Sequence, residues 1–198
     1  FWRDVTDRRD ALEALRRSEQ RLRIAVQVGG LGLWDWNILT GQVHWSDEHF
    51  AMQGYRAGEV IPSYEAWLER VHPHDRQAAQ GAITAAMEDG GDYEHEFRTL
   101  HPDGAVHWLA ARGRFFYEDG RAVRMIGAMA DVTEHRRVTD ALRRGQQRQA
   151  FLLALADTLR PLYEPARIKA EAMRVLGRHL GVNRAHYYEV DASGGSFD

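Results

Sequence analysis

The sequence predicts an α+β domain built on an antiparallel sheet, and two observations lead to this prediction. Three strand-like runs, 93–100, 106–116 and 123–132, follow one another with only short turns between them. The turns contain HPDG and EDG, whose Asp-Gly pairs are typical of hairpins. Because parallel strands need a crossover helix and no helical pattern fits between these runs, we expect an antiparallel meander.

Two shorter strands and three helices are expected before this meander. The run LGLWDWNI at 31–38 alternates in strand periodicity, and residues 42–45 follow it after a Thr-Gly turn. Helical spacing, with Ser46 as a cap, then predicts three short helices. They cover residues 46–52, 64–71 and about 75–87.

One charged phrase brackets this domain. DVTDRRDALEALRR at residues 4–17 returns as DVTEHRRVTDALRR at residues 131–144. In each copy a threonine, Thr6 or Thr133, stands between an extended end and a helical pattern. Its hydroxyl is expected to cap the helix that follows.

The two phrases lead into flanking helices. Residues 7–28 carry leucines at coiled-coil spacings, and residues 134–150 form the second expected linker helix. Beyond it, two helical runs precede a strand-like run at 185–190, and fewer than fifty residues are too few for an ordinary independent core. The sheet is therefore expected to lie between N- and C-terminal helices.

Composition excludes several kinds of protein. A net charge of −3 gives no electrostatic footprint for nucleic acid. The chain has no cysteine, so it forms no disulfide and no thiolate metal site. No run approaches the roughly 18 apolar residues of a membrane span, and we expect a cytoplasmic location. Nucleophile-elbow, P-loop and HExxH motifs are also missing, so no catalytic activity is expected.

Several stretches together resemble a PAS domain that ends in a PAC motif. They are GLGLWDWNILTGQVHWSDEHFAMQGY, ERVHPHDR, EFRTLHPDGAVHWLAARGRFF and GRAVRMIGAMADVTEHR. The resemblance implies a PAS fold, a five-stranded antiparallel sheet with short helices on one face. The run from 151 resembles the start of a GAF domain. The expected divisions are an upstream PAS-like tail at 1–6, linker helices at 7–28 and 134–150, the PAS domain at 29–133 and a GAF start at 151–198.

The resemblance also implies a function. PAS proteins pass a conformational signal from the last strand through a D-x-T phrase into a helix. Asp131 and Thr133 match that phrase, and so do Asp4 and Thr6. We expect a sensory or relay module of a longer signalling protein, either a sensor histidine kinase of a two-component system or a cyclic-dinucleotide enzyme. The partners implied are a second copy, paired through a coiled coil, and neighbouring PAS, GAF and output domains.

Two alternative functions stay open, a passive dimerisation spacer and a sensor for haem or another small ligand. The absence of cysteine excludes covalent flavin photochemistry. His72 and His74 in the sequence HPHD are the candidate haem ligands. The same residues also suit a helix start, with Pro73 in the first turn and Asp75 as the cap.

Aromatic residues and methionines at strand and helix spacings form either a packed core or the lining of a ligand pocket. The candidate pocket residues are Trp36, Met52, Trp67, Trp108 and Met125.

Overall fold

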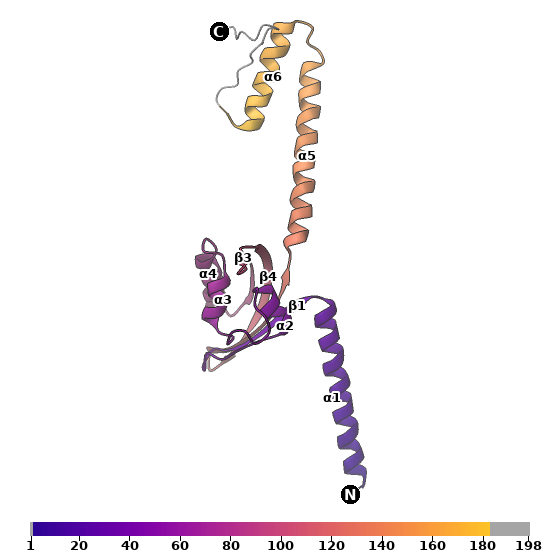
Figure 1. Ribbon diagram of the computed structural model, residues 1–198, viewed down its shortest axis with the longest axis vertical. Coiled ribbons are helices and arrows are strands. Elements are labelled where there is room, and N and C mark those ends of the chain that lie inside the picture. Colours follow the sequence, from indigo (N-terminus) through magenta and orange to yellow (C-terminus); the bar gives the residue numbers. More distant parts are fainter. Residues whose placement is uncertain (1, 183–198) are drawn as a thin grey trace. The chain divides into compact units, whose positions relative to one another are not determined.

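The computed structural model describes residues 2–182, with side chains from residue 12 onward (Figure 1). The chain divides into two compact units between Arg136 and Arg137. Among residues 2–182, no helix combines the length and the apolar composition that crossing a membrane requires.

The first unit contains one five-stranded sheet in which all neighbouring strands are antiparallel. The spatial order of its strands is β2-β1-β5-β4-β3. The strands are β1 (Leu31–Asn37), β2 (Val43–Trp45), β3 (Asp92–Leu100), β4 (Val106–Glu118) and β5 (Arg121–Asp131). The predicted meander and its two earlier strands are therefore confirmed.

Three helices lie beside one face of this sheet, and we call that face the inner face (Figure 1). They are α2 (Asp47–Met52), α3 (Tyr64–Arg70) and α4 (Arg76–Asp89). Ser46 caps α2 as predicted, since its Oγ accepts a hydrogen bond from the His49 N–H at 3.3 Å. Gly90, in the left-handed conformation, ends α4.

The inner face is closely packed. The side chains of Phe97, Leu109 and Met129 are almost completely buried there. Gly127 pairs across the sheet with Trp34, and a Cβ atom at Gly127 would collide with the Trp34 ring. Because no side chain occupies this position, the indole of Trp34 packs directly against the backbone at Gly127.

The opposite, outer face carries charged side chains. Strand residues alternate between the faces, so Arg112 and Arg114 point outward between buried Ala111, Gly113 and Phe115. Their partners are Glu94 and Asp92 on β3.

Three longer helices flank the sheet in sequence: α1 (Trp2–Val28), α5 (Thr133–Leu159) and α6 (Pro165–Leu180). The prediction that Thr6 caps a helix after a strand end is wrong, because α1 already begins at Trp2. Thr133 follows β5, whose pairing keeps the preceding backbone extended. Residues 2–6 pair with no described strand, so no strand pairing keeps their backbone extended, and they form the first turns of α1. The strand expected at 185–190 lies outside the described residues.

Candidate functional site

The end of β5 and the start of α5 are joined to β4 by backbone and side-chain hydrogen bonds. The Trp108 N–H donates to Thr133 Oγ1 at 2.8 Å, and the Trp108 carbonyl accepts from the Val132 N–H at 2.8 Å. The Thr133 N–H donates to Asp131 Oδ1 at 2.8 Å. Asp131 and Thr133, predicted as a pair, are therefore brought together. Trp108 binds Val132 and Thr133, where β5 ends and α5 begins.

The second carboxylate oxygen of Asp131 binds a histidine. His107 Nδ1 lies 2.8 Å from Asp131 Oδ2, and the His107 ring stacks on His101 at 4.3 Å between centroids. Partial burial raises the pKa of Asp131, but the hydrogen bonds from Thr133 and His107 outweigh it and lower the pKa overall. The carboxylate is therefore charged at neutral pH and remains a hydrogen-bond acceptor for the helix start.

The ring of Trp108 contacts the first turn of α5 through Arg136. The Arg136 guanidinium carbon lies 3.9 Å from the Trp108 ring centroid, and Arg136 Nε donates to Glu96 Oε2 on β3 at 3.0 Å. Arg98 approaches the same ring at 5.5 Å. The prediction of Trp108 as a pocket residue is wrong, because buried Leu109 takes the inward position on β4. Trp108 lies on the outer face.

We call the group formed by Trp108, Asp131, Thr133 and Arg136 the joint. Sequence reasoning identified two of its members and missed the role of the other two. The charged residues that follow Trp108 in alternation, at 112 and 114, are the signal that places its ring on the outer face. The matching roles predicted for Asp4 and Thr6 stay predictions, because their side chains are not described.

A small cavity lies between the inner face and the helices. Its volume is about 50 Å³. Three of the candidate pocket residues, Trp36, Trp67 and Met125, lie in its lining. The other lining residues are Trp34, Val43, Trp45, His49, Ser63, Tyr64, Ile83, Tyr93, Phe97, Ala111 and Met129. The fourth predicted pocket residue, Met52, is not part of the lining. It packs toward β1, where Gly32 leaves room for its sulfur.

The volume decides which ligands this cavity holds. It is about a third of a roughly 150 Å³ cavity that binds benzene. A haem or a flavin is many times larger and does not fit unless the lining side chains move. The residues present therefore do not fit either cofactor.

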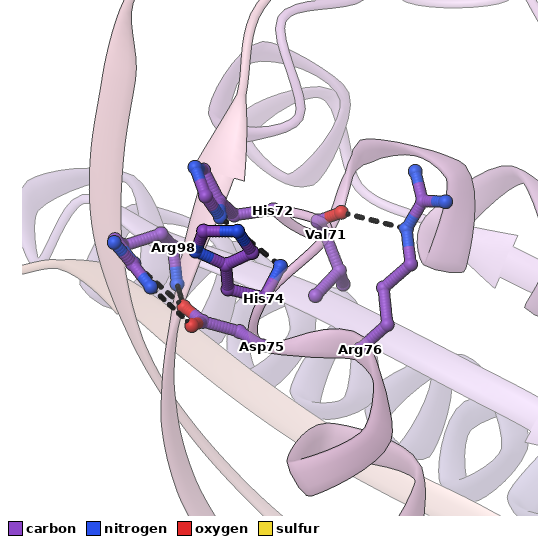
Figure 2. Close-up of polar contacts among 6 residues, drawn as sticks. All are labelled: Val71, His72, His74, Asp75, Arg76 and Arg98. Carbon is purple, nitrogen blue, oxygen red and sulfur yellow. Dashed lines mark hydrogen bonds and ion pairs between the residues drawn. The ribbon is translucent and has the colours of Figure 1, made fainter.

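The predicted haem ligands are placed elsewhere. His72 and His74 precede α4 and contact each other, with the His74 N–H donating to His72 Nδ1 at 3.3 Å (Figure 2). Neither lines the cavity. Among the described residues, no group of three histidine, aspartate or glutamate side chains is arranged to hold a metal ion.

Asp75 binds Arg98 instead of capping α4 (Figure 2). Its Oδ2 accepts hydrogen bonds from the Arg98 backbone N–H and from Nε, both at 2.9 Å. The Arg98 side chain is the main reason why the pKa of Asp75 is lowered to about 2. The predictions of Asp75 as a side-chain cap and of Pro73 in the first turn are wrong, because α4 begins at Arg76 and this ion pair takes the carboxylate.

His49 and Tyr93 also line the cavity and were not predicted as site residues. Each is 2% exposed, and neither ring nitrogen of His49 nor the Tyr93 hydroxyl has a hydrogen-bond partner. Burial lowers the pKa of His49 to about 3, and the nearby Leu33 backbone, which does not meet the geometry of a hydrogen bond to the ring, acts in the opposite direction. No local pattern identifies His49, since its position depends on the close approach of α2 to Gly32.

Comparison with known proteins gives consistent matches. Residues 42–129 match the family model described as the PAS fold. The chain is 31% identical over 142 residues to the sensor protein FixL of Bradyrhizobium diazoefficiens, which covers 71% of this chain and 27% of FixL. It is 28% identical over 144 residues to the probable diguanylate cyclase DgcE of Escherichia coli, covering 69% of this chain and 13% of DgcE. The chain thus spans only a small part of these curated relatives.

A solved structure extends the likeness. The sensory box histidine kinase/response regulator from Burkholderia thailandensis aligns with a TM-score of 0.57 and 32% sequence identity. The alignment covers 66% of this chain and 98% of that one.

Proposed function

Because this chain belongs to the PAS family of sensory modules in signalling proteins, we propose that it relays a conformational signal from its core into α5 through the joint. One observation carries the proposal. Trp108 binds Thr133 and Val132 through its backbone N–H and carbonyl, and Arg136 through its ring. A displacement of β4 would therefore be transmitted to the first turn of α5.

The same strand reaches the cavity. Ala111, three residues after Trp108, is 3% exposed and lines the cavity wall. Since packed interiors deform little, a change in cavity occupancy would shift β4 as a whole. The signal path proposed here is thus short: cavity wall, β4, joint and helix.

A second link joins the helical layer to the joint. Asp75, immediately before α4, forms an ion pair with Arg98 on β3. The Arg98 guanidinium carbon lies 5.5 Å from the Trp108 ring centroid. Ile83 of α4 also lines the cavity. A movement of α4 would therefore reach Trp108 through an ion pair as well as through the sheet.

We propose that α5 passes the signal on as part of a coiled coil with a second copy of the chain. Val138, Leu142 and Leu152 recur at alternating spacings typical of a coiled-coil seam, and Leu142 is 62% exposed. Gly145 and Gln149 fall at seam positions between them. Such weak positions keep the pairing marginal, which suits a helix that has to change register or rotation.

The relatives also suggest which output domain the longer protein would carry. The signal would control an output domain outside this chain, a histidine kinase as in the sensory box protein from Burkholderia thailandensis or a diguanylate cyclase as in DgcE. The segment from 151, which begins within α5 and includes α6, would be the start of a GAF domain that lies between the two.

The proposal is tested in the longer parent protein with a matched pair of variants. Thr133→Val keeps the shape of the side chain and removes the acceptor of the Trp108 N–H, whereas Thr133→Ser keeps the hydroxyl. We expect Thr133→Val to lose the difference in output between stimulated and unstimulated protein, measured as phosphoryl transfer or cyclic-dinucleotide synthesis. Thr133→Ser should retain it. An unchanged response of Thr133→Val would contradict the relay and favour a passive spacer.

A further inference from the structure

Two stacked histidine rings connect the end of α2 to the joint. His107 Nδ1 lies 2.8 Å from Asp131 Oδ2, and the His107 ring stacks on His101 with 4.3 Å between centroids and 17° between the planes. His101 Nε2 in turn lies 2.9 Å from the backbone carbonyl oxygen of Met52, the last residue of α2. The relay through Trp108 does not use this stacked pair.

The position of the His101 ring is determined by the backbone beside it. A Cβ atom at Gly54 would lie 2.8 Å from the His101 ring, and Gly54 has a φ of 76°, in the left-handed region. The glycine therefore leaves the space that the half-buried His101 ring fills. Packing on this side and the hydrogen bond to Met52 together hold the ring in the stack.

We propose that the stacked pair of His101 and His107 is a proton-binding site, and that a proton on His107 tightens the joint through Asp131. The effector is then acidification between about pH 8 and pH 5, the range in which histidine changes charge. The proposal deepens the relay function and rests on it, because the joint is the part that the proton would control.

The hydrogen-bond partners determine where the two neutral rings carry their hydrogens. A carbonyl oxygen and an ionised carboxylate oxygen only accept hydrogen bonds. His101 therefore carries its hydrogen on Nε2, which faces Met52, and His107 carries its hydrogen on Nδ1, which faces Asp131. The nitrogens left to take up a proton are His101 Nδ1 and His107 Nε2.

The stack favours one proton over two. Two imidazolium rings at 4.3 Å would repel each other, because like charges at this distance interact strongly. The charged carboxylate of Asp131 favours the cation on His107, the ring that it contacts. The His107 side chain is 33% exposed, so solvent can deliver the proton.

Other charged or titratable groups lie on the elements next to the pair. They are Asp103 in the turn before β4, Arg98 on β3, Glu134, His135 and Arg136 on α5, Arg70 on α3, and Asp47, Glu48 and His49 on α2. Arg98 and Arg136 each form an ion pair with another carboxylate, and Arg70 lies over the Tyr55 ring. The Asp103 carboxylate accepts the Ala105 N–H, and His49 lines the cavity. Asp131 is the carboxylate in direct contact with the pair.

Protonation of His107 strengthens its contact with Asp131. It adds the attraction between opposite charges to a hydrogen bond whose acceptor is already ionised. The other oxygen of Asp131 accepts the Thr133 N–H at 2.8 Å. A carboxylate that is held more firmly should therefore reduce local opening at the start of α5.

Nitrogen NMR of the 198-residue chain tests where the proton binds. At about pH 8 we expect the Nε2–H tautomer for His101 and the Nδ1–H tautomer for His107. On acidification to about pH 5.5, His107 should become doubly protonated while His101 keeps its neutral form. Protonation of His101 first, or of both rings together, would overturn the proposal.

Amide exchange of the Thr133 N–H, corrected for the intrinsic rate at each pH, tests the effect on the joint. We expect its protection to rise roughly three- to fivefold from about pH 7.5 to about pH 5.5, as for a partly exposed ion pair. His107→Gln keeps a donor to Asp131 but takes up no proton, and should lose this rise. His101→Gln keeps a donor to the Met52 carbonyl and should retain it.

His44→Gln is the matched control, because His44 lies on the edge strand β2 and has no contact with the joint. The rise in protection should be unchanged in this variant. Protection that does not rise on acidification, or that rises equally in His107→Gln, would overturn the proposal. If the proton binds and tightens the joint as expected but His107→Gln leaves the pH response of output in the longer parent protein unchanged, the proton site is supported and the relay function is contradicted.

Discussion

The two faces of the same sheet are built by alternate residues of the same strands and have opposite properties. The inner face is aromatic and closely fitted, and it encloses the cavity beside Trp34 and Tyr93. The outer face is a row of exposed ion pairs, such as Arg112 with Glu94, interrupted by the ring of Trp108. The inner face thus supplies close packing around a cavity, whereas the outer face provides the contact with α5.

This difference predicts that equal chemical changes have unequal effects on the two faces. Overpacking or charging the inner face disturbs many neighbours at once. Exposed ion pairs contribute little to the free energy of folding, because water screens the charges and the side chains lose entropy on pairing. Trp108 is the exception on the outer face, since its backbone and ring bind three residues at the start of α5.

At neutral pH the largest effect is expected at Gly127 on the inner face. Gly127→Ala places a methyl group against the Trp34 ring and the Arg112 carbonyl. We expect a loss of about 3 kcal/mol in the free energy of unfolding, measured by urea denaturation. Gly81→Ala is the control, since nothing lies near a Cβ at this position in α4, and helix propensity should make it about 1 kcal/mol more stable. Similar results for both would refute the close fit of the inner face.

Below neutral pH a second inner-face effect appears, the pH dependence caused by His49. Its pKa is about 3 in the folded chain and 6.5 when exposed, so below pH 6.5 the unfolded state binds a proton that the folded state does not. Stability should fall with decreasing pH by up to about 1.4 kcal/mol per pH unit between these values.

His49→Phe should remove this part of the slope, seen by comparing urea midpoints of variant and wild type from pH 7 down to about pH 4. The same slope in both would show that the imidazole is not buried in its neutral form.

A smaller effect is expected from the partly buried ion pair of Asp75 and Arg98. The pKa of Asp75 is lowered from 3.8 to about 2, so its contribution is complete above pH 3.8 and is lost as the pH falls toward 2. Because the two side chains are 16% and 30% exposed, we expect about 1–2 kcal/mol. In Asp75→Asn this loss occurs at all pH values, and the acid-dependent component between pH 3.8 and 2 disappears. Thermal unfolding at several pH values measures it.

The smallest effect is expected at the fully outer pair of Arg112 and Glu94, whose side chains are 77% and 66% exposed. Arg112→Gln should change the free energy of unfolding by about 0.5 kcal/mol or less. A loss as large as that of Asp75→Asn would mean that the outer ion pairs act as one network and not as separate contacts.

Local sequence signals were sufficient for most of the fold. The Asp-Gly turns define the meander, and Ser46 marks the start of α2 because a hydroxyl cap acts within one turn. The same reasoning failed at both threonines of the repeated phrase. Thr6 lies inside α1, and the Thr133 hydroxyl accepts its hydrogen bond from the Trp108 N–H on β4, at the position where α5 begins.

The site was less predictable because it depends on which face a residue takes. Met125 lies in the cavity wall, because it alternates with outward residues on a central strand. Trp108 was placed wrongly, because its aromatic character suggested the core, whereas the alternation with Arg112 and Arg114 assigns it to the outer face. His49 depends on contact between α2 and β1, which no local pattern encodes.

The measurement that tests the relay most directly is amide hydrogen exchange in the first turns of α5, in a double-mutant cycle. Ala111→Val perturbs β4 from the cavity side. Thr133→Val removes the hydrogen bond between the Trp108 N–H and the Thr133 hydroxyl in the joint. We expect Ala111→Val to alter exchange at residues 134–140 in the wild-type background and to have no such effect when Thr133 is replaced by valine. An identical effect of Ala111→Val in both backgrounds, or none in either, would contradict the joint as the route from the core to the helix.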